Sequence, residues 1–306
     1  MSESSKPLPN HVPVLSAEVL EVFSDHAPQT LVDCTIGLGG HAQLLLERHE
    51  QMRLIGLDAD SRNLEIAAKR LAKYSGRMRL VHADFAELER VLAEAGLASV
   101  EGVLADLGVS SNQIADPARG LSFDADGPLD MRFDLRRKTT AADLVNGLSE
   151  GELSDLLYLQ SQERYSRRIA KRICQVRRQG RINSTVMLAR LVAAAVGENP
   201  DRHYGRIHPA TRTFMALRMA VNQEPESLRR LLDLLPRVLG ERGRVAIISF
   251  HSGEDRLVKV DFRTRARDGV YRLLTKRPIV PQEDERRANP RSRSAKLRAA
   301  ERCTAS

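Results

Sequence analysis

A glycine-rich turn is the first feature of this sequence that could serve chemistry. Gly37, Gly39 and Gly40 stand between an apolar run and a helical pattern, and His41 follows them directly. Glycine lets the backbone pass close to a ligand where a Cβ atom would clash. Asp58 comes roughly twenty residues later, where a carboxylate can accept hydrogen bonds from both hydroxyls of a ribose. The pattern predicts a nucleotide-cofactor site, and NAD is a candidate because the turn nearly fits G-x-G-x-x-G/A.

Polar residues also follow the next two predicted strands. Asp84 and Phe85 follow one of them, where the acid could accept the adenine amino group while the aromatic ring packs against the base. Asp106 ends the other, where a methyl donor and its acceptor would meet in a methyltransferase-like sheet. Either aspartate alone could be a loop or cap carboxylate. Their recurrence at successive strand ends favours S-adenosylmethionine over NAD.

The elements that would position these residues alternate between strands and helices. Apolar runs predict strands at residues 30–36, 52–57, 79–82 and 100–105, with helical patterns between them. Asp60 or Ser61 is the expected cap of the second helix. This alternation predicts a doubly wound parallel α/β sheet with helices on both faces, whose ligands collect at the carboxyl ends of the strands.

The pattern changes after Ser110. A turn-rich stretch at residues 116–134 leads into helical patterns, and strand signals return only at Arg244, after a predicted turn at residues 240–243. We therefore expect a discontinuous sheet domain, 1–111 and 212–306, with an inserted, mainly helical substrate-recognition subdomain at 112–211.

The charge balance favours a polyanionic partner. The 306 residues include 48 Lys and Arg against 40 Asp and Glu, which gives a net charge of +8. A helix predicted at residues 161–179 places Arg164, Arg168 and Arg172 at i, i+4 spacing, and a second basic cluster lies at residues 286–302. Each is either a solvated face or a site for RNA phosphates.

Several classes of protein are disfavoured. The three cysteines are far apart and form no C-x-x-C pair, and no metal-ligand spacing is recognisable, so we expect no metal. Residues 1–10 are polar and unlike a signal peptide, and no apolar run is long enough to cross a bilayer. These features predict a soluble cytoplasmic protein without a membrane partner. They leave the oligomeric state open, a homodimer included.

Two further groups of residues have alternative readings. Ser249, His251 and Asp255 could suggest a hydrolase, but no G-x-S-x-G elbow is present, so a contact to a flipped base or a helix cap is favoured for His251. Asp130 and Arg132 could contact RNA or pin the insertion in place.

Motifs along most of the chain resemble one family, the 16S rRNA cytosine-N4 methyltransferases, also called ribosomal RNA small subunit methyltransferase H. The matching segments are His11-Val-Pro-Val-Leu15, Asp33-Cys-Thr-Ile-Gly-Leu-Gly-Gly-His41, Asp106-Leu-Gly-Val-Ser-Ser111, Arg119-Gly-Leu-Ser-Phe123, Gly127-Pro-Leu-Asp-Met-Arg132, His208-Pro-Ala-Thr-Arg-Thr-Phe214, Ser249-Phe-His-Ser-Gly-Glu-Asp-Arg256 and Asn289-Pro-Arg-Ser-Arg293.

The resemblance implies a class I S-adenosylmethionine-dependent methyltransferase sheet with a helical insertion. It implies methylation of the exocyclic N4 of a cytidine in the decoding centre, the P-site region, of 16S rRNA within the small ribosomal subunit. The cofactor residues it implies are Gly39, Gly40, His41, Asp58, Phe85, Asp106 and Gln113. Gly37 and Asp84 are added from the positions of the turn and the strand ends.

Asp106 is the expected catalytic residue. The cytosine amino nitrogen is a poor nucleophile because its lone pair is delocalised into the ring, so an acceptor for its protons would raise its electron density. The alternative is that Asp106 binds cofactor only. Two other functions compete with the methyltransferase, namely an NAD-dependent oxidoreductase that uses the same turn and a nucleotide-sensing RNA-binding module without catalysis.

Overall fold

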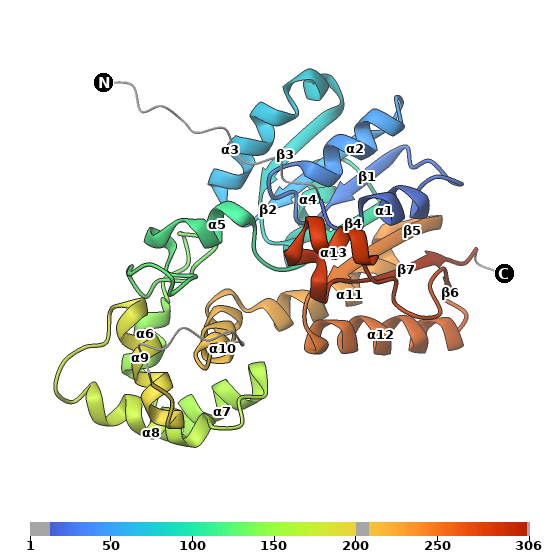
Figure 1. Ribbon diagram of the computed structural model, residues 1–306. Helices are drawn as coiled ribbons and strands as arrows, with labels where there is room; N and C mark the ends of the chain where they lie inside the picture. Colours follow the sequence, from blue (N-terminus) through green and yellow to red (C-terminus); the bar gives the residue numbers. More distant parts are fainter. Residues whose placement is uncertain (1–12, 200–207, 305–306) are drawn as a thin grey trace, which may run out of the picture. The chain divides into compact units, whose positions relative to one another are not determined.

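A computed structural model describes residues 13–199 and 208–304, which divide into two compact units (Figure 1). The first unit comprises the described residues up to Gly108 and from Ser227 onward, and the second comprises those between Val109 and Glu226. His11 and Val12, which open the first family motif, lie outside the described residues. The second boundary falls later than the expected residue 212 because Phe214 and Leu217 pack in the core of the second unit.

The first unit is built on one seven-stranded sheet with the strand order β3-β2-β1-β4-β5-β7-β6. Its strands are β1 (Thr30–Asp33), β2 (Arg53–Asp58), β3 (Met78–His82), β4 (Val100–Asp106), β5 (Leu239–Ser249), β6 (Tyr271–Leu273) and β7 (Lys296–Arg302). The first five pair in parallel, whereas β7 lies antiparallel between β5 and β6. The predicted doubly wound α/β sheet is confirmed, with one reversed strand.

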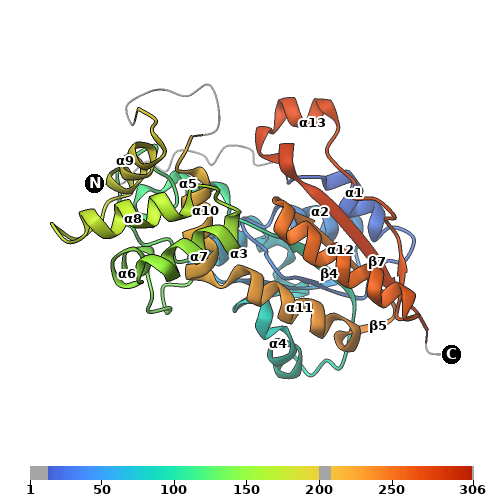
Figure 2. The same cartoon turned by 90° about the horizontal axis from the view of Figure 1, so that it is seen from below.

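Helices cover both faces of this sheet (Figure 2). They are α1 (Ser16–Val22), α2 (Gly40–Arg48), α3 (Ser61–Arg70), α4 (Leu88–Glu94), α11 (Glu224–Val238), α12 (Ser252–Arg267) and α13 (Glu283–Ala288), with 3₁₀ turns η1 (Ala72–Arg77), η2 (Phe85–Glu87) and η4 (Pro290–Ser294). Helices α1, α2 and α3 pack on one face, and α4, α11 and α12 on the other. Successive strand residues point to opposite faces, so Leu31 joins one core cluster and Val32 the other.

Strands β6 and β7 are absent from the sequence-based prediction. β7 carries Lys296, Arg298 and Arg302, so it was read as part of a basic cluster. In the structure Arg298 is buried, and its Nε donates a hydrogen bond of 2.7 Å to Asp255 on α12. The interpretation of Arg298 as part of an RNA-binding cluster is therefore wrong, because its guanidinium is buried and pairs with Asp255 within the first unit.

Replacing Arg298 by Met should lower the free energy of unfolding by about 3 kcal/mol, because it leaves the buried Asp255 carboxylate with only Lys296, at 3.4 Å. Urea denaturation followed by circular dichroism measures the change. Arg293→Met is the matched control, since Arg293 is exposed and should cost under about 0.5 kcal/mol. Equal stability of the two variants would contradict a structural role for this ion pair.

The turn predicted at residues 240–243 lies inside β5. Val100 pairs with Leu239 and Gly102 with Arg244, so the four residues between Leu239 and Arg244 form an irregularity opposite a single residue of β4. Gly243 is required there, because a Cβ atom would lie 2.8 Å from the carbonyl oxygen of Gly240. The turn residues shape the beginning of the strand.

The second unit is helical. It contains α5 (Ser111–Ala115), η3 (Pro117–Arg119), α6 (Ala141–Gly147), α7 (Glu150–Ser161), α8 (Ser166–Val176), α9 (Thr185–Val196) and α10 (Thr211–Asn222). Residues from α6 to α10 share one apolar core. The single helix predicted at residues 161–179 is wrong: Gln162 adopts a left-handed conformation, φ 55°, and ends α7, so α8 begins only at Ser166.

In the part of the chain that the structure describes, no helix is long and apolar enough to cross a membrane.

Candidate active site

Three aspartates lie where parallel strands end. Asp33, Asp58 and Asp106 are the last residues of β1, β2 and β4. The register places Asp33 opposite Gly56 on β2 and Leu104 on β4, so these strand ends form one edge of the sheet. The carboxyl ends of parallel strands are where open α/β sheets bind their ligands. The expected position of the site is therefore matched by a cluster of acids.

The glycine turn joins β1 to α2 at this edge. Gly37 and Gly39 have φ values of +51° and +79°, which side-chain-bearing residues rarely adopt. A Cβ atom on Gly40 would lie 3.2 Å from the ring of Pro13, so this glycine also serves close packing. These φ values and this contact are why glycine is needed at the turn.

Asp58 is the centre of the hydrogen bonds around the turn. Its carboxylate accepts from the N–H of Gly37 at 2.9 Å, the N–H of Asp60 at 2.8 Å and the Asn63 side chain at 3.2 Å. Burial raises the pKa of Asp58 to about 6, although these hydrogen bonds act in the opposite direction. The carboxylate therefore both holds the turn and keeps acceptor capacity for a ligand hydroxyl.

Asp33 is a member of this cluster that sequence reasoning did not single out, although it opens a quoted motif. It accepts from the N–H of Thr35 at 3.1 Å, and the Thr35 hydroxyl oxygen accepts from the N–H of Asp106 at 2.6 Å. Burial raises the pKa of Asp33 to about 7, against the effect of the nearby His41. Thr35 thus links the ends of β1 and β4.

His41 and Asp106 form a pair with unused hydrogen-bonding capacity. His41, on the first turn of α2, is 6% exposed, and its Nε2 lies 3.5 Å from Oδ2 of Asp106. Both ring nitrogens and Oδ1 of Asp106 are buried, and none has a hydrogen-bond partner among the described residues. Buried polar atoms usually have partners, so these atoms indicate that a ligand completes the site.

Asp84 and Phe85 lie after β3, as predicted. Asp84 caps η2: one carboxylate oxygen accepts from the N–H of Ala86 at 2.8 Å, and the other from the Ser227 hydroxyl at 3.1 Å. Phe85 is half-buried against the core. Asp84 therefore orders the turn that presents Phe85.

His251 is the N-cap of α12. Its Nδ1 accepts from the N–H of Glu254 at 3.4 Å, while the Glu254 side chain accepts from the N–H of Phe250 at 3.0 Å. Asp255 is held by Arg298 and Ser249 bonds to the carbonyl of Lys296. These residues stabilise the junction of β5, α12 and β7, and no catalytic triad is formed among them.

The remaining predicted residues belong to the second unit. Gln113 is buried and closes a capping box with Ser110, whose N–H donates to it at 3.0 Å. Asp130 and Arg132 form a two-pronged ion pair with both N···O distances at 2.7 Å, and Arg132 also donates to the carbonyl of Arg137. The hydrogen bonds from Arg132 outweigh burial and hold the pKa of Asp130 below its ordinary value. The ion pair therefore stabilises the loop in which both residues lie.

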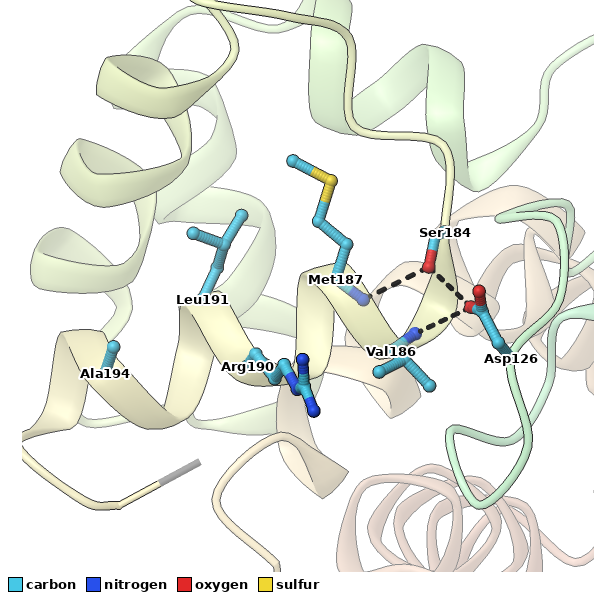
Figure 3. Close-up of a pocket in the computed structure, with 7 residues that line it drawn as sticks. All are labelled: Asp126, Ser184, Val186, Met187, Arg190, Leu191 and Ala194. Carbon is cyan, nitrogen blue, oxygen red and sulfur yellow. Dashed lines mark hydrogen bonds between the residues drawn. The ribbon is translucent and has the colours of Figure 1, made fainter. Parts of the chain in front are cut away.

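Arg168 and Arg172 lie exposed on α8, and Arg164 precedes the helix. The second unit also has a hollow of about 500 Å³ along α9, lined by Asp126, Ser184, Val186, Met187, Arg190, Leu191 and Ala194 (Figure 3). Its acid, Asp126, accepts from the Val186 N–H at 3.3 Å and from the hydroxyl of Ser184, the N-cap of α9, and so stabilises the start of this helix. The Asp126 carboxylate therefore already accepts hydrogen bonds, whereas Oδ1 of Asp106 has no partner among the described residues.

Comparison with known proteins identifies the family. Residues 9–303 match the model of the MraW methylase family. The chain belongs to this family. It is similar to proteins named ribosomal RNA small subunit methyltransferase H from Sorangium cellulosum (49% identity, covering 95% of this chain and 90% of the relative), Solibacter usitatus (46%; 95% and 99%) and a Cyanothece species (45%; 96% and 95%).

Membership of a methylase family, together with the sheet described above, establishes a class I methyltransferase fold. S-adenosylmethionine is the cofactor. The cluster fits it, because the acidic side chains of Asp33, Asp58 and Asp106 at the strand ends suit a ligand with a positive sulfonium and ammonium group and ribose hydroxyls. Because the methylase family uses S-adenosylmethionine, the NAD interpretation of the turn is wrong.

Proposed function

We propose that this protein transfers a methyl group from S-adenosylmethionine to the exocyclic N4 of a cytidine in the decoding centre, the P-site region, of 16S rRNA. The proposal rests on near full-length similarity to relatives named ribosomal RNA small subunit methyltransferase H. Oδ1 of Asp106, which is buried and has no hydrogen-bond partner in the described part of the chain, supports an amino group as the methyl acceptor, because an amine brings protons that need an acceptor. The product would be N4-methylcytidine, formed in the small ribosomal subunit.

We assign the cofactor contacts to the strand-end cluster. Asp58 accepts the ribose hydroxyls, Phe85 packs against adenine, and the turn of Gly37, Gly39 and Gly40 lets the backbone approach the ligand. His41 and Asp106 face the methionine part, and Asp33 positions Asp106 through Thr35. Gln113 and an adenine contact by Asp84 remain predictions.

In this reaction the protein has to align the cytosine nitrogen with the methyl group and accept a proton from that nitrogen. When bound, the cofactor supplies an electrophilic methyl group whose bond to sulfur breaks as the new carbon–nitrogen bond forms. The cytosine nitrogen loses one proton in exchange for the methyl group, and Asp106 accepts it. The link through Thr35 fixes the backbone of Asp106 and so positions this residue at the end of β4.

RNA recognition is assigned to the second unit. Arg168 and Arg172 are exposed and have no acidic partner among the described residues, so they can bind phosphates. Asp130 and Arg132 bind each other, which favours a role in shaping their loop. A contact between His251 and the substrate base remains a prediction beside its role as a cap.

Cofactor affinity should fall as the pH decreases through about 6. The pKa of Asp58 is raised to about 6, and a protonated carboxyl loses its charge and part of its acceptor capacity. Below that pH the Kd for S-adenosylhomocysteine should rise by up to about tenfold per pH unit. Calorimetry from pH 5 to pH 8 measures the Kd, and Asp33→Asn is the control, which should still lose affinity near pH 6. If Asp58→Asn also loses affinity near pH 6, Asp58 is not the group whose protonation weakens binding.

Methyl transfer from labelled S-adenosylmethionine to small ribosomal subunits that lack the modification tests the function, with nucleoside mass spectrometry as the readout. N4-methylcytidine is the expected product. Cofactor binding without a methylated nucleoside would exclude this substrate, and would favour the RNA-binding module without catalysis.

A further inference from the structure

The corner between α7 and α8 exposes three apolar side chains. Tyr158, Leu159 and Tyr165 are 57%, 74% and 48% exposed. They flank a tight turn between the helices: the N–H of Gln162 donates to the carbonyl of Tyr158 at 2.8 Å, and the N–H of Glu163 to that of Leu157 at 3.4 Å. Large exposed apolar groups on both sides of one turn indicate a binding surface.

The α8 side of this corner is strongly basic, whereas on α7 the exposed Asp155 lies one turn before Tyr158. Between Glu163 and Glu198 the chain carries nine arginine or lysine residues and no aspartate or glutamate. The exposed members nearest the corner are Arg164, Arg167, Arg168, Lys171 and Arg172. Arg212 reaches the same turn from α10, where its guanidinium donates to the carbonyl of Gln162 at 3.4 Å. This excess of positive charge favours an anionic partner.

The aromatic rings indicate which kind of anionic partner this corner binds. The guanidinium of Arg168 lies over the ring of Tyr165, 5.7 Å from its centroid, so the ring already faces a flat cation. On the opposite side of α8, Ile169 and Ile173 are buried in the helical core, which leaves the basic side to solvent. Rings beside arginines are the arrangement that binds nucleotides whose bases are unpaired, since the bases stack while the cations bind the phosphates.

We propose that the α7–α8 corner, formed by Tyr158, Leu159 and Tyr165 with the cations around it, binds unpaired nucleotides of the RNA substrate. This inference rests on the proposed function, and adds that the insertion distinguishes single-stranded from paired RNA. Stacking on tyrosine needs a free face of the base, which a continuous duplex does not offer. The arginines alone would bind both forms.

Fluorescence anisotropy with the full-length chain tests the proposal, using two labelled RNAs of equal nucleotide number: a hairpin with an unpaired loop and a fully paired duplex. Y158A/Y165A should weaken hairpin binding about tenfold and change duplex binding less than twofold. Y158F/Y165F should bind as the unmodified protein does, because the ring stacks and the hydroxyl does not. Thermal melting checks that the variants remain folded.

Charge variants separate stacking from attraction to phosphate. R168Q/R172Q should weaken binding of both RNAs and reduce the slope of log affinity against log salt by about two. R230Q/R263Q removes two exposed arginines from α11 and α12 and is the matched control, with both RNAs bound as before. Equal losses on hairpin and duplex for Y158A/Y165A, or no loss, would overturn the proposal. Displacement of the hairpin by poly-glutamate as readily as by unlabelled hairpin would also overturn it, in favour of an acidic protein partner.

The methylation assay keeps the two proposals distinct. If Y158A/Y165A forms N4-methylcytidine normally and binds the hairpin and the duplex as before, the proposed reaction is supported and the α7–α8 corner is excluded as a binding site. If Y158A/Y165A selectively loses hairpin binding but the unmodified protein forms no N4-methylcytidine, the corner is supported as an RNA-binding site and the proposed reaction is excluded.

Discussion

Asp106→Asn should lower the rate of methyl transfer by at least about 100-fold, while the Kd for S-adenosylhomocysteine changes less than about fivefold. Asparagine has the same shape and keeps the N–H that donates to Thr35, so the end of β4 should stay in place. In the reaction we propose, the cytosine nitrogen loses a proton that the asparagine amide cannot accept. Single-turnover transfer from labelled cofactor measures the rate, and calorimetry measures the affinity.

Asp60→Asn is the matched control for this experiment. Asp60 lies near the cluster but caps α3 through the N–H of Arg62 at 3.0 Å, and asparagine caps helices about as well as aspartate. Its turnover should stay within about threefold. Full turnover in Asp106→Asn would exclude Asp106 as proton acceptor, and a rate loss matched by a loss of cofactor affinity would make it a cofactor ligand only.

Asp58→Ala should weaken cofactor binding about 100-fold. The substitution removes two charged acceptors for the ribose and also frees the N–H of Gly37, so the turn loses the contact that holds it. Each hydrogen bond to a charged group contributes about 1.5–3 kcal/mol, and two of them account for the expected change. Calorimetry with S-adenosylhomocysteine measures it.

Asn63→Ala supplies the comparison, since it removes only the longest donor to Asp58, at 3.2 Å, and leaves the carboxylate in place. Its Kd should rise about threefold. At saturating cofactor, Asp58→Ala should recover most of its turnover, because we assign Asp58 to cofactor binding and not to methyl transfer. A variant that binds normally but transfers slowly would place Asp58 in the chemical step.

Helices with local capping and strands with continuous apolar runs were predictable because their signals are local. Asp60 caps α3 as expected, and the first four strands begin and end within a few residues of their predicted bounds. β7 was missed because Arg298 reads as a surface charge in sequence. Only its pairing with Asp255, more than forty residues away, makes burial of that charge acceptable.

The basic helix shows a different limit. Its apolar side, with Ile169 and Ile173, was recognisable from helical spacing. Its start was misplaced because nothing in the composition marks Gln162 as a left-handed helix end. The exposure of Tyr158 and Leu159 was equally invisible, since an apolar residue at helical spacing is usually part of a core.

The sequence by itself determined the alternation that builds the sheet, the positive-φ glycines of the turn and the acids at successive strand ends, because each depends on neighbours a few residues away. Only the tertiary structure decided how those acids differ. Asp84 and Asp255 are occupied by caps and ion pairs, Asp58 holds the glycine turn, and Asp106 retains a buried oxygen without a partner among the described residues. Whether a carboxylate is available for chemistry depends on what distant segments donate to it, and that is fixed by packing.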